Sequence, residues 1–306
     1  MRVVVVGAGA VGSYYGAMLA QAGHPVCLVG RAAHVAAVRE QGLRLQRDRG
    51  VETVRLEATT DLAAVAGADW VLCAVKSGDT ETVGRAMRPH LAPGAGVLSL
   101  QNGVDNAARL AAVLGREVHP VVVYVAVALQ GPGVVRHLGR GELVVGPAQA
   151  LAPLVDALQR AGVAVAVSDH VPTALWTKLV INCAYNALSA LSGMPYGPLF
   201  AAQGAAEVLR DVVSECLAVA QANGVQLPAD IHRQVVGIAA SMPGQRSSTA
   251  QDLSRGKRTE IDHLNGWVVR EADRLGLPAP ANRVLWVLVR LREAAGAEVL
   301  DCPNVP

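Results

Sequence analysis

The chain has few aromatic residues, few lysines and no marked excess of charge. Its 306 residues include one phenylalanine, five tyrosines and four tryptophans, while hydrophobic residues make up 52% of the chain. This composition predicts a soluble globular protein of two domains packed with alanine, valine and leucine. The net charge is +2, and no run of basic residues alternates with aromatic ones. A nucleic-acid or membrane-surface partner is therefore not expected.

Paired cysteines and clustered histidines are also missing. The eight histidines are dispersed, and the five cysteines lie far apart without a C-x-x-C pair: Cys27, Cys73, Cys183, Cys216 and Cys302. We expect neither a disulfide framework nor a metal site, and a reducing cytoplasm is the natural setting. Glycines, prolines and amides interrupt the uncharged stretches 3–30 and 179–206, so no run of about 20 apolar residues predicts a membrane span.

Lysine occurs at only three positions, and one of them begins a regular polar pattern. Lys178 stands four positions before Asn182, which stands four before Asn186. In a helix this spacing puts all three on one face, within about 80° of drift. Their neighbours are mostly apolar, so these polar groups need partners. Since lysine, unlike arginine, can give up its proton, the stripe predicts a site; satisfied core amides and a lysine paired with an acid are the alternative.

The first half of the chain alternates β-branched runs with helical patterns. Expected strands cover 2–6, 25–29, 70–75, 96–100 and 118–127, and expected helices cover 10–22, 32–41, 79–88 and 105–114. Hairpin-like insertions lie near 43–56 and 133–145, and a last helix and strand lie within 150–167. Such alternation predicts a parallel sheet with helices on both faces.

Only helical patterns follow residue 168. They cover about 171–191, 201–223, 228–240, 260–275 and 281–295. We therefore predict an α/β Rossmann-type domain over residues 1–168 and an all-α domain over residues 169–306.

The first expected strand runs into a G-x-G-x-x-G turn at Gly7, Gly9 and Gly12. In a dinucleotide-binding fold these glycines allow the tight turn, the close approach of the backbone to a pyrophosphate, and the packing of helix on strand. The triplet alone is a weak signal, but here it follows a strand and opens a helix. The predicted cofactor-binding segment is Gly7, Ala8, Gly9, Ala10, Val11 and Gly12.

The end of the second expected strand selects the cofactor. NAD sites usually place an acidic residue there, against the ribose hydroxyl. This chain has Gly30 and Arg31 instead, and its first acidic residue is Glu40. Arginine suits a 2′-phosphate in charge and in bidentate geometry, so NADPH is the predicted cofactor; a surface arginine without a binding role is the alternative.

Two further polar residues follow expected strands, at the strand ends where open α/β sheets bind ligands. They are Lys76 and Asn102. The carboxamide of Asn102 can bind a nicotinamide, a ribose or a substrate, although an Asn-Gly turn with Gly103 is a sufficient structural reason for it. Together with the glycine loop, the pair favours a ligand site.

A late segment has an equally structural interpretation. Thr259 can cap a helix whose first turn holds Glu260 and Asp262, where acidic residues are favoured. That explanation is sufficient for Asp262 and competes with a functional role for Glu260.

Several motifs together resemble the ketopantoate reductase (2-dehydropantoate 2-reductase) family, from residue 1 to about residue 295. Residues 7–16 read Gly-Ala-Gly-Ala-Val-Gly-Ser-Tyr-Tyr-Gly, and residues 175–186 read Leu-Trp-Thr-Lys-Leu-Val-Ile-Asn-Cys-Ala-Tyr-Asn. Segments 28–31, 75–76 and 101–103 match as well. Residues 247–252 (Ser-Ser-Thr-Ala-Gln-Asp) and 259–266 (Thr-Glu-Ile-Asp-His-Leu-Asn-Gly) are more specific than the glycine loop.

The resemblance implies a 6-phosphogluconate-dehydrogenase-like fold with the active site in a cleft. It implies reduction of 2-dehydropantoate to (R)-pantoate by NADPH, a step toward pantothenate and coenzyme A. Lys178 would be the proton donor, and Glu260 a catalytic residue that contacts substrate or cofactor hydroxyls. The residues implied in substrate binding are Asn102, Asn182, Asn186 and Ser248, and those at the nicotinamide end are Lys76 and Asn102.

The chain departs from the family pattern in two places. Ala187 stands where a proline is common, and the loop 193–197 lacks the usual Asn-Gly. A reductase of the same scaffold that acts on another 2-keto acid is therefore the alternative. A non-catalytic NADP-binding sensor is an alternative of a different class, although it would not need the acid and substrate residues. The sequence leaves open which alanine near 126–128 approaches the cofactor, whether the chain is a monomer or a homodimer, and how Glu260 and burial balance at Lys178.

Overall fold

The structure, a computed structural model, describes residues 1–301, and the side chains of residues 1–295. It divides into two compact units. Unit 1 covers Met1–Val171, and unit 2 begins at Pro172. Each is described by itself below.

Unit 1 is built on one ten-stranded sheet with the strand order β4-β3-β9-β8-β7-β6-β1-β2-β5, and β10 pairs with β9. The strands are β1 Val3–Val6, β2 Val26–Val29, β3 Leu43–Arg47, β4 Gly50–Val54, β5 Glu57–Thr59, β6 Trp70–Cys73, β7 Gly96–Ser99, β8 His119–Gly131, β9 Val134–Val145 and β10 Val165–Val167. From β5 to β8 every pairing is parallel. The predicted parallel sheet is confirmed.

Helices cover both faces of this sheet, as the alternating pattern predicts. In β1, Val3 and Val5 point to one core and Val4 and Val6 to the other, because successive side chains of a strand point to opposite faces. The helical segments of unit 1 are α1 Ala10–Gln21, α2 Ala32–Gln41, η1 Leu62–Gly67, η2 Ser77–Asp79, α3 Thr80–Met87, η3 Arg88–His90, α4 Asn106–Leu114, η4 Gln149–Leu151 and α5 Ala152–Arg160. Residues of α1, α2 and α5 line the first core, and residues of η1, α3 and α4 line the second.

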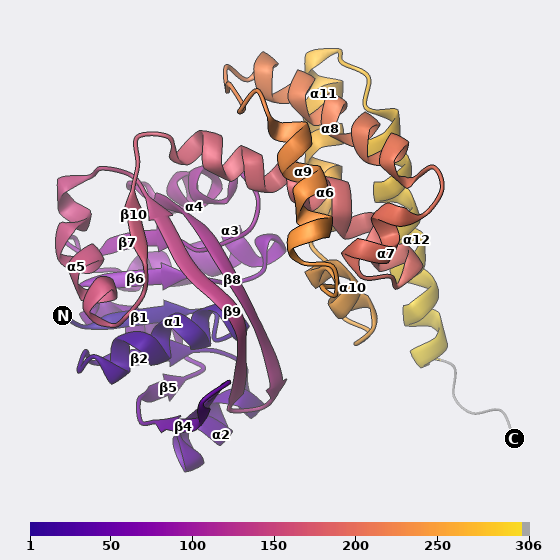
Figure 1. The fold of residues 1–306 in the computed structure, drawn as a ribbon. Helices are drawn as coiled ribbons and strands as arrows, with labels where there is room; N and C mark the ends of the chain where they lie inside the picture. The colour runs from indigo at the N-terminus through magenta and orange to yellow at the C-terminus, as the bar shows by residue number, and fades with distance from the viewer. Residues whose placement is uncertain (302–306) are drawn as a thin grey trace, which may run out of the picture. The chain divides into compact units, whose positions relative to one another are not determined.

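The two expected hairpin insertions have different outcomes. The segment 43–56 forms the antiparallel pair β3–β4. The segment 133–145 is a single strand, β9, which pairs antiparallel with residues 121–131 of β8 (Figure 1). Its glycines and its register shifts against β8 obscure the alternation expected of a long strand. The three-residue strand β5 was not predicted, since it is too short to show a period.

The described residues of unit 2 form helices joined by loops, with no strand among them. Its elements are α6 Val171–Ser192, α7 Tyr196–Ala201, α8 Ala205–Ala222, α9 Ile231–Ser241, α10 Ser248–Leu253, η5 Ile261–His263, α11 Asn265–Leu275 and α12 Pro280–Asp301. The short helices α7 and α10 were not predicted; α7 begins directly after Pro195 and contains Pro198 in its first turn, a position where proline is tolerated. No helix within residues 1–301 is long and apolar enough to cross a membrane.

Candidate active site

Gly7 and Gly12 give the loop after β1 its shape. Gly7 has φ +104°, and a Cβ there would lie 2.6 Å from the backbone of Ala74 and Val75. A Cβ on Gly12 would lie 2.2 Å from the carbonyl oxygen of Gly7. Neither position can carry a side chain, because backbone atoms occupy the space.

Gly9 differs from both. Its φ is −79°, which any residue adopts, and a Cβ there would meet no protein atom within 4 Å. Neither backbone conformation nor packing within the chain requires glycine at this position. A glycine that leaves open space beside a helix N-terminus fits the close approach of a pyrophosphate.

The donors available to such an anion are the first N–H groups of α1. The N–H groups of Gly7 and Ala8 already donate to the carbonyl oxygen of Val29, at 3.0 and 2.9 Å. Helix α1 has no side-chain cap and no acidic residue in its first turn. The N–H groups of Ala10 and Val11 therefore lack intrahelical acceptors and fit a phosphate.

Arg31 stands two residues after the end of β2, next to Gly30, which contacts this loop. A Cβ on Gly30 would lie 2.6 Å from the Cβ of Ala8, so the two segments are in close contact. Arg31 is exposed and precedes the first turn of α2, which has no acidic residue. The described residues offer its guanidinium no hydrogen bond or ion pair. This environment is compatible with an anionic ligand group.

Lys76 and Asn102 follow the neighbouring parallel strands β6 and β7, and partly buried hydrogen bonds join their segments. The hydroxyl of Ser77 donates to the carbonyl oxygen of Asn102 at 3.2 Å. The carboxamide of Asn106 donates to the same oxygen at 2.5 Å. The fold thus brings together two site residues that the sequence could only place separately. Asn106 was missed because one asparagine at a helix start is typical of capping.

The alanines near the predicted cofactor site differ in exposure. Ala128 is 6% exposed, whereas Ala126 is half-buried and has the more accessible surface. The pairing of β8 with β9 shifts register between Tyr124 and Val125 and again between Ala126 and Val127. These irregularities explain why sequence alternation could not assign the facing side chains.

In unit 2, the polar stripe lies on one continuous helix, α6. Lys178 and Asn182 are half-buried, and Asn186 is 3% exposed. The carboxamides of Asn182 and Asn186 make no hydrogen bond with the described residues. No atom of Asn186 is among the fully buried side-chain atoms that lack a partner. Its carboxamide therefore remains accessible, and Asn186 is a candidate to bind a polar ligand.

The segment that precedes α10 is fastened to α6 beside Asn186. The hydroxyl of Ser247 donates to the carbonyl oxygen of Asn186 at 3.1 Å, and its N–H donates to the hydroxyl of Ser189 at 3.2 Å. Ser247 is also the cap of α10, because its oxygen accepts from the N–H of Ala250. Capping therefore does not explain Ser248, which is exposed and adjoins a residue bonded to the stripe.

The predicted helix start at Thr259 is confirmed in part. Its hydroxyl accepts from the N–H of Ile261 at 3.2 Å, but one 3-10 turn follows and α11 begins only at Asn265. Asp262 accepts from the indole of Trp286 at 2.8 Å and from Arg290 at 2.6 Å. Burial would raise the pKa of Asp262, but these donors and the nearby arginine charge lower it overall. Asp262 thus has a structural role, and that explanation does not extend to the half-buried Glu260.

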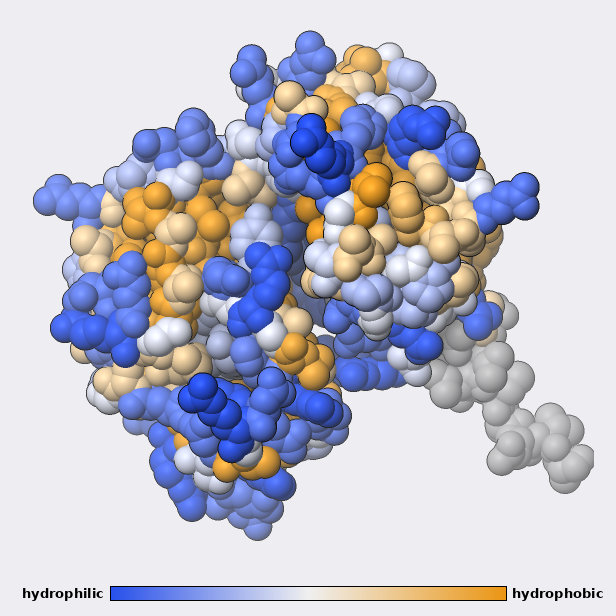
Figure 2. Space-filling view, in the orientation of Figure 1, coloured by the Kyte–Doolittle hydropathy of each residue, from blue (hydrophilic) through white to orange (hydrophobic). Residues whose placement is uncertain are grey.

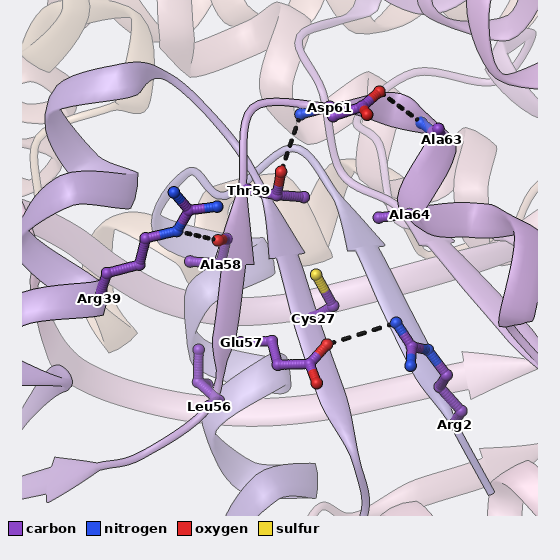
Figure 3. A pocket seen from close by; sticks show the side chains of 10 residues that line it. All are labelled: Arg2, Cys27, Arg39, Leu56, Glu57, Ala58, Thr59, Asp61, Ala63 and Ala64. Carbon is purple, nitrogen blue, oxygen red and sulfur yellow. Dashed lines mark hydrogen bonds and ion pairs between the residues drawn. The ribbon is translucent and has the colours of Figure 1, made fainter.

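A surface groove of about 640 Å³ in unit 1 contains none of the predicted site residues (Figure 3). Its walls carry structural contacts: Arg2 pairs with Glu57 at 3.3 Å, and Arg39 donates to the carbonyl oxygen of Ala58 on the edge strand β5 at 2.6 Å. Cys27 lines the groove, and burial raises the pKa of its thiol, which makes it a weak nucleophile.

Neither a disulfide nor a cluster of metal ligands occurs among the described residues. The described cysteines, Cys27, Cys73, Cys183 and Cys216, are free and buried, and Cys302 lies outside the described residues. Within the described chain no three histidine, cysteine or acidic side chains form a group that could hold a metal ion.

Comparison with known proteins gives one family for both units. Residues 3–150 match "Ketopantoate reductase PanE/ApbA", and residues 170–293 match its C-terminal part. A 2-dehydropantoate 2-reductase from Halobacterium salinarum is 37% identical, over 97% of this chain and 100% of that protein. One from Pyrococcus abyssi is 30% identical, over 96% and 98%.

Solved structures show the same fold. A PanE/ApbA family ketopantoate reductase from Ralstonia eutropha JMP134 is 55% identical with a TM-score of 0.94, over 97% of this chain and 100% of that one. A D-mandelate dehydrogenase solved with NADH and anilino(oxo)acetate shares the fold with a TM-score of 0.91 at 24% identity, over 97% and 100%. On these matches, and with the α/β and helical units described above, the chain belongs to the ketopantoate reductase family and is an oxidoreductase that acts on CH–OH groups.

Proposed function

We propose that this protein reduces 2-dehydropantoate to (R)-pantoate with NADPH, a step toward pantothenate and coenzyme A. The observation that carries the proposal is the stripe on α6, where Asn186, a residue only 3% exposed whose carboxamide has no protein partner, shares a face with a lysine. A keto acid offers the oxygens that such a face can bind. Relatives named 2-dehydropantoate 2-reductase support the choice of acid.

The cofactor part of the proposal rests on unit 1. NADPH, when bound, supplies the hydride. The open space beside Gly9 and the uncapped start of α1 suit its pyrophosphate. Arg31 and the uncapped N-terminus of α2 suit the additional 2′-phosphate, which NADH lacks. Lys76 and Asn102 would hold the nicotinamide end.

The proton is assigned to Lys178. When the carbonyl carbon of a 2-keto acid is reduced, negative charge develops on the former carbonyl oxygen. An ammonium group stabilises that charge as it forms and then donates a proton to the oxygen. An arginine would supply the charge but would hold its proton too firmly.

The remaining polar residues would orient the substrate. Asn182 and Asn186 each offer two donors and an acceptor from a fixed helix face, and the Ser248 hydroxyl lies one residue from the contact with Asn186. Glu260 would accept hydrogen bonds from hydroxyl groups of substrate or cofactor. Its carboxylate would also favour the charged form of a nearby ammonium.

Lys178 variants give the sharpest test. We expect Lys178→Ala to lower kcat by about 10² to 10⁴ while the dissociation constant for NADPH stays near that of the wild type. Lys178→Arg keeps the charge but not the labile proton, so its kcat should remain far below the wild-type value. The kcat of each variant is measured by following the consumption of NADPH in the presence of ketopantoate by absorbance. Unchanged turnover in Lys178→Ala would reject the proton donor.

Two alternative functions have distinct results in the same assay. A reductase for another 2-keto acid would prefer a different member of a panel of keto acids. The same fold occurs in a protein named D-mandelate dehydrogenase, which is why such a panel is needed. A non-catalytic sensor would bind NADPH in the wild type and turn over none of the acids. We favour the reductase because the chain has both the glycine loop for the cofactor and the polar stripe of Lys178, Asn182 and Asn186, which a sensor would not need.

We also propose that the protein forms a homodimer. The exposed apolar residues of α12 recur at the spacing of one helix face: Val284, Val287, Leu288 and Leu291. A second apolar surface lies over β10 and α5 (Figure 2), where Val167 is 54% exposed. Either surface could pack against a second copy, and sedimentation of the purified protein decides between monomer and dimer.

A further inference from the structure

A buried set of polar side chains joins the two segments that carry Lys76 and Asn102. We call it the loop-end network, and its members are Ser77, Thr80, Gln101, Asn106 and Arg109. Four of them are less than 7% exposed, the exception being Arg109. Polar groups buried to this degree specify one arrangement when all are satisfied, so the network fixes the shape of the segments it joins.

Asn106, the first residue of α4, uses every hydrogen-bonding position of its carboxamide. Its nitrogen donates to the carbonyl oxygen of Asn102 at 2.5 Å and to the hydroxyl of Ser77 at 3.0 Å. Its oxygen lies 3.1 Å from the hydroxyl of Thr80 and accepts from Arg109 at 3.2 Å. Two donors and two lone pairs are all that an asparagine has. A rotated amide would turn its oxygen toward the Asn102 carbonyl, so only one orientation is compatible with the network.

Gln101 makes a second connection between the same segments. Its nitrogen donates to the hydroxyl of Thr80 at 2.7 Å and to the carbonyl oxygen of Val75 at 3.2 Å. Its oxygen accepts from the hydroxyl of Ser99 at 2.9 Å. Val75 immediately precedes Lys76, so both proposed nicotinamide-end residues adjoin atoms that the network holds.

Arg109 closes the network on its outer side. Its guanidinium binds Glu81 through two hydrogen bonds of 2.7 Å and donates to the carbonyl oxygen of Ser77 at 3.0 Å. A bidentate arginine–carboxylate pair has a defined geometry. The network therefore spans η2, α3 and the start of α4 rather than a single turn.

Helix capping does not account for this arrangement. Asp105 is the capping position of α4 and makes no side-chain capping bond. Asn106 instead reaches back to Asn102 and across to Ser77, which belongs to a different strand–helix connection. Its bonds serve the relation between the two segments.

We propose that Asn106 is a positioning residue for the reaction: it sets the place of Asn102 and Lys76 relative to each other and thereby the affinity for the nicotinamide end of the cofactor. The proposal rests on the function proposed above. It assigns to Asn106 no contact with substrate or cofactor.

Two variants of Asn106 and one control test it. Asn106→Ala removes all four bonds. Asn106→Asp keeps the acceptors for Thr80 and Arg109, but it removes both donors and turns an oxygen toward the Asn102 carbonyl. The matched control is Leu114→Ala at the other end of α4, where a buried side chain (6% exposed) packs in the apolar core and takes part in none of the network's hydrogen bonds.

We expect the dissociation constant for NADPH, measured by fluorescence titration at 25 °C, to rise about tenfold in both Asn106 variants, and kcat to fall with it. Leu114→Ala should lower the melting temperature but keep the wild-type dissociation constant and kcat. Circular dichroism verifies that each protein is folded. If Asn106→Ala fails to fold, Asn106→Asp decides the question.

A purely structural role gives a different result. Folded Asn106 variants would then match Leu114→Ala, with lower melting temperature and wild-type NADPH affinity, and the proposal would be overturned. Failure of the proposed function is separately visible, because the wild type itself would then bind no NADPH or reduce no 2-keto acid.

Discussion

Arg31 is the residue on which the choice between NADPH and NADH depends. It is exposed, has no bonded partner among the described residues, and stands beside the glycine loop. We expect Arg31→Ala to weaken NADPH binding by about 1.5–3 kcal/mol, the range for hydrogen bonds to charged groups, and to leave NADH binding nearly unchanged. Titration of the variant with both cofactors measures the difference.

The matched control for Arg31 lies on the helix that follows it. Arg39→Ala removes an equal charge from α2, but the guanidinium of Arg39 is bonded to Ala58 on β5. It should affect both cofactors alike. Equal losses of NADPH and NADH affinity in Arg31→Ala would contradict the assignment of the 2′-phosphate.

Single residues also show how far the sequence could predict the site. The four-residue spacing placed Lys178, Asn182 and Asn186 on one helix face, because helical periodicity is a local property. The bond from Ser247 to the Asn186 backbone joins positions 61 residues apart. Such a contact depends on tertiary packing and leaves no periodic signal, so the sequence could name Ser248 only by family resemblance.

At the scale of elements, His34 connects three parts of unit 1. Its Nδ1 accepts from the N–H of Gly133 at the β8–β9 turn, at 3.1 Å. Its Nε2 lies 3.2 Å from the hydroxyl of Ser13 on α1, and His34 itself belongs to α2. Since Nδ1 must be an acceptor, the neutral ring carries its proton on Nε2. Burial lowers the pKa of His34.

This histidine should make stability depend on pH. Below about pH 6.5 the histidine of the unfolded chain binds a proton, whereas that of the folded chain binds it only at lower pH. The free energy of unfolding therefore decreases as the pH is lowered, by up to about 1.4 kcal/mol per pH unit. Urea unfolding between about pH 7 and pH 5 measures the slope. His34→Gln should lower stability near neutral pH and flatten the slope, whereas Ser13→Ala should lower stability and keep it. An unchanged slope in His34→Gln would exclude His34 as its source.

The elements that the sequence predicted well are those with a clear period or a buried apolar run. The strands of the parallel core and the long helices of unit 2 are of this kind. The six-residue helices α7 and α10 contain too few turns to show a period. Strand β9 has glycines at 139 and 141 with φ +138° and +148°, so its backbone irregularity masks the alternation.

For the whole molecule, the proposed binding residues divide between the two units. All proposed cofactor residues except Glu260 belong to unit 1, and all proposed substrate residues except Asn102 belong to unit 2. A ligand protects most the segments that it contacts. The two ligands should therefore produce separate patterns of amide hydrogen exchange along one chain.

We expect saturating NADPH to slow exchange mainly in segments 7–13, 30–35 and 75–80 of unit 1, and pantoate added with NADP⁺ to slow it further in segments 245–250 and 258–263. Gly9→Ala is the control. Its Cβ would meet no protein atom within 4 Å, so exchange without ligand should match the wild type, but its methyl group would occupy the space proposed for the pyrophosphate. The NADPH-dependent protection should be lost in this variant. Full protection in Gly9→Ala, or NADPH protection confined to unit 2, would show that the dinucleotide binds elsewhere.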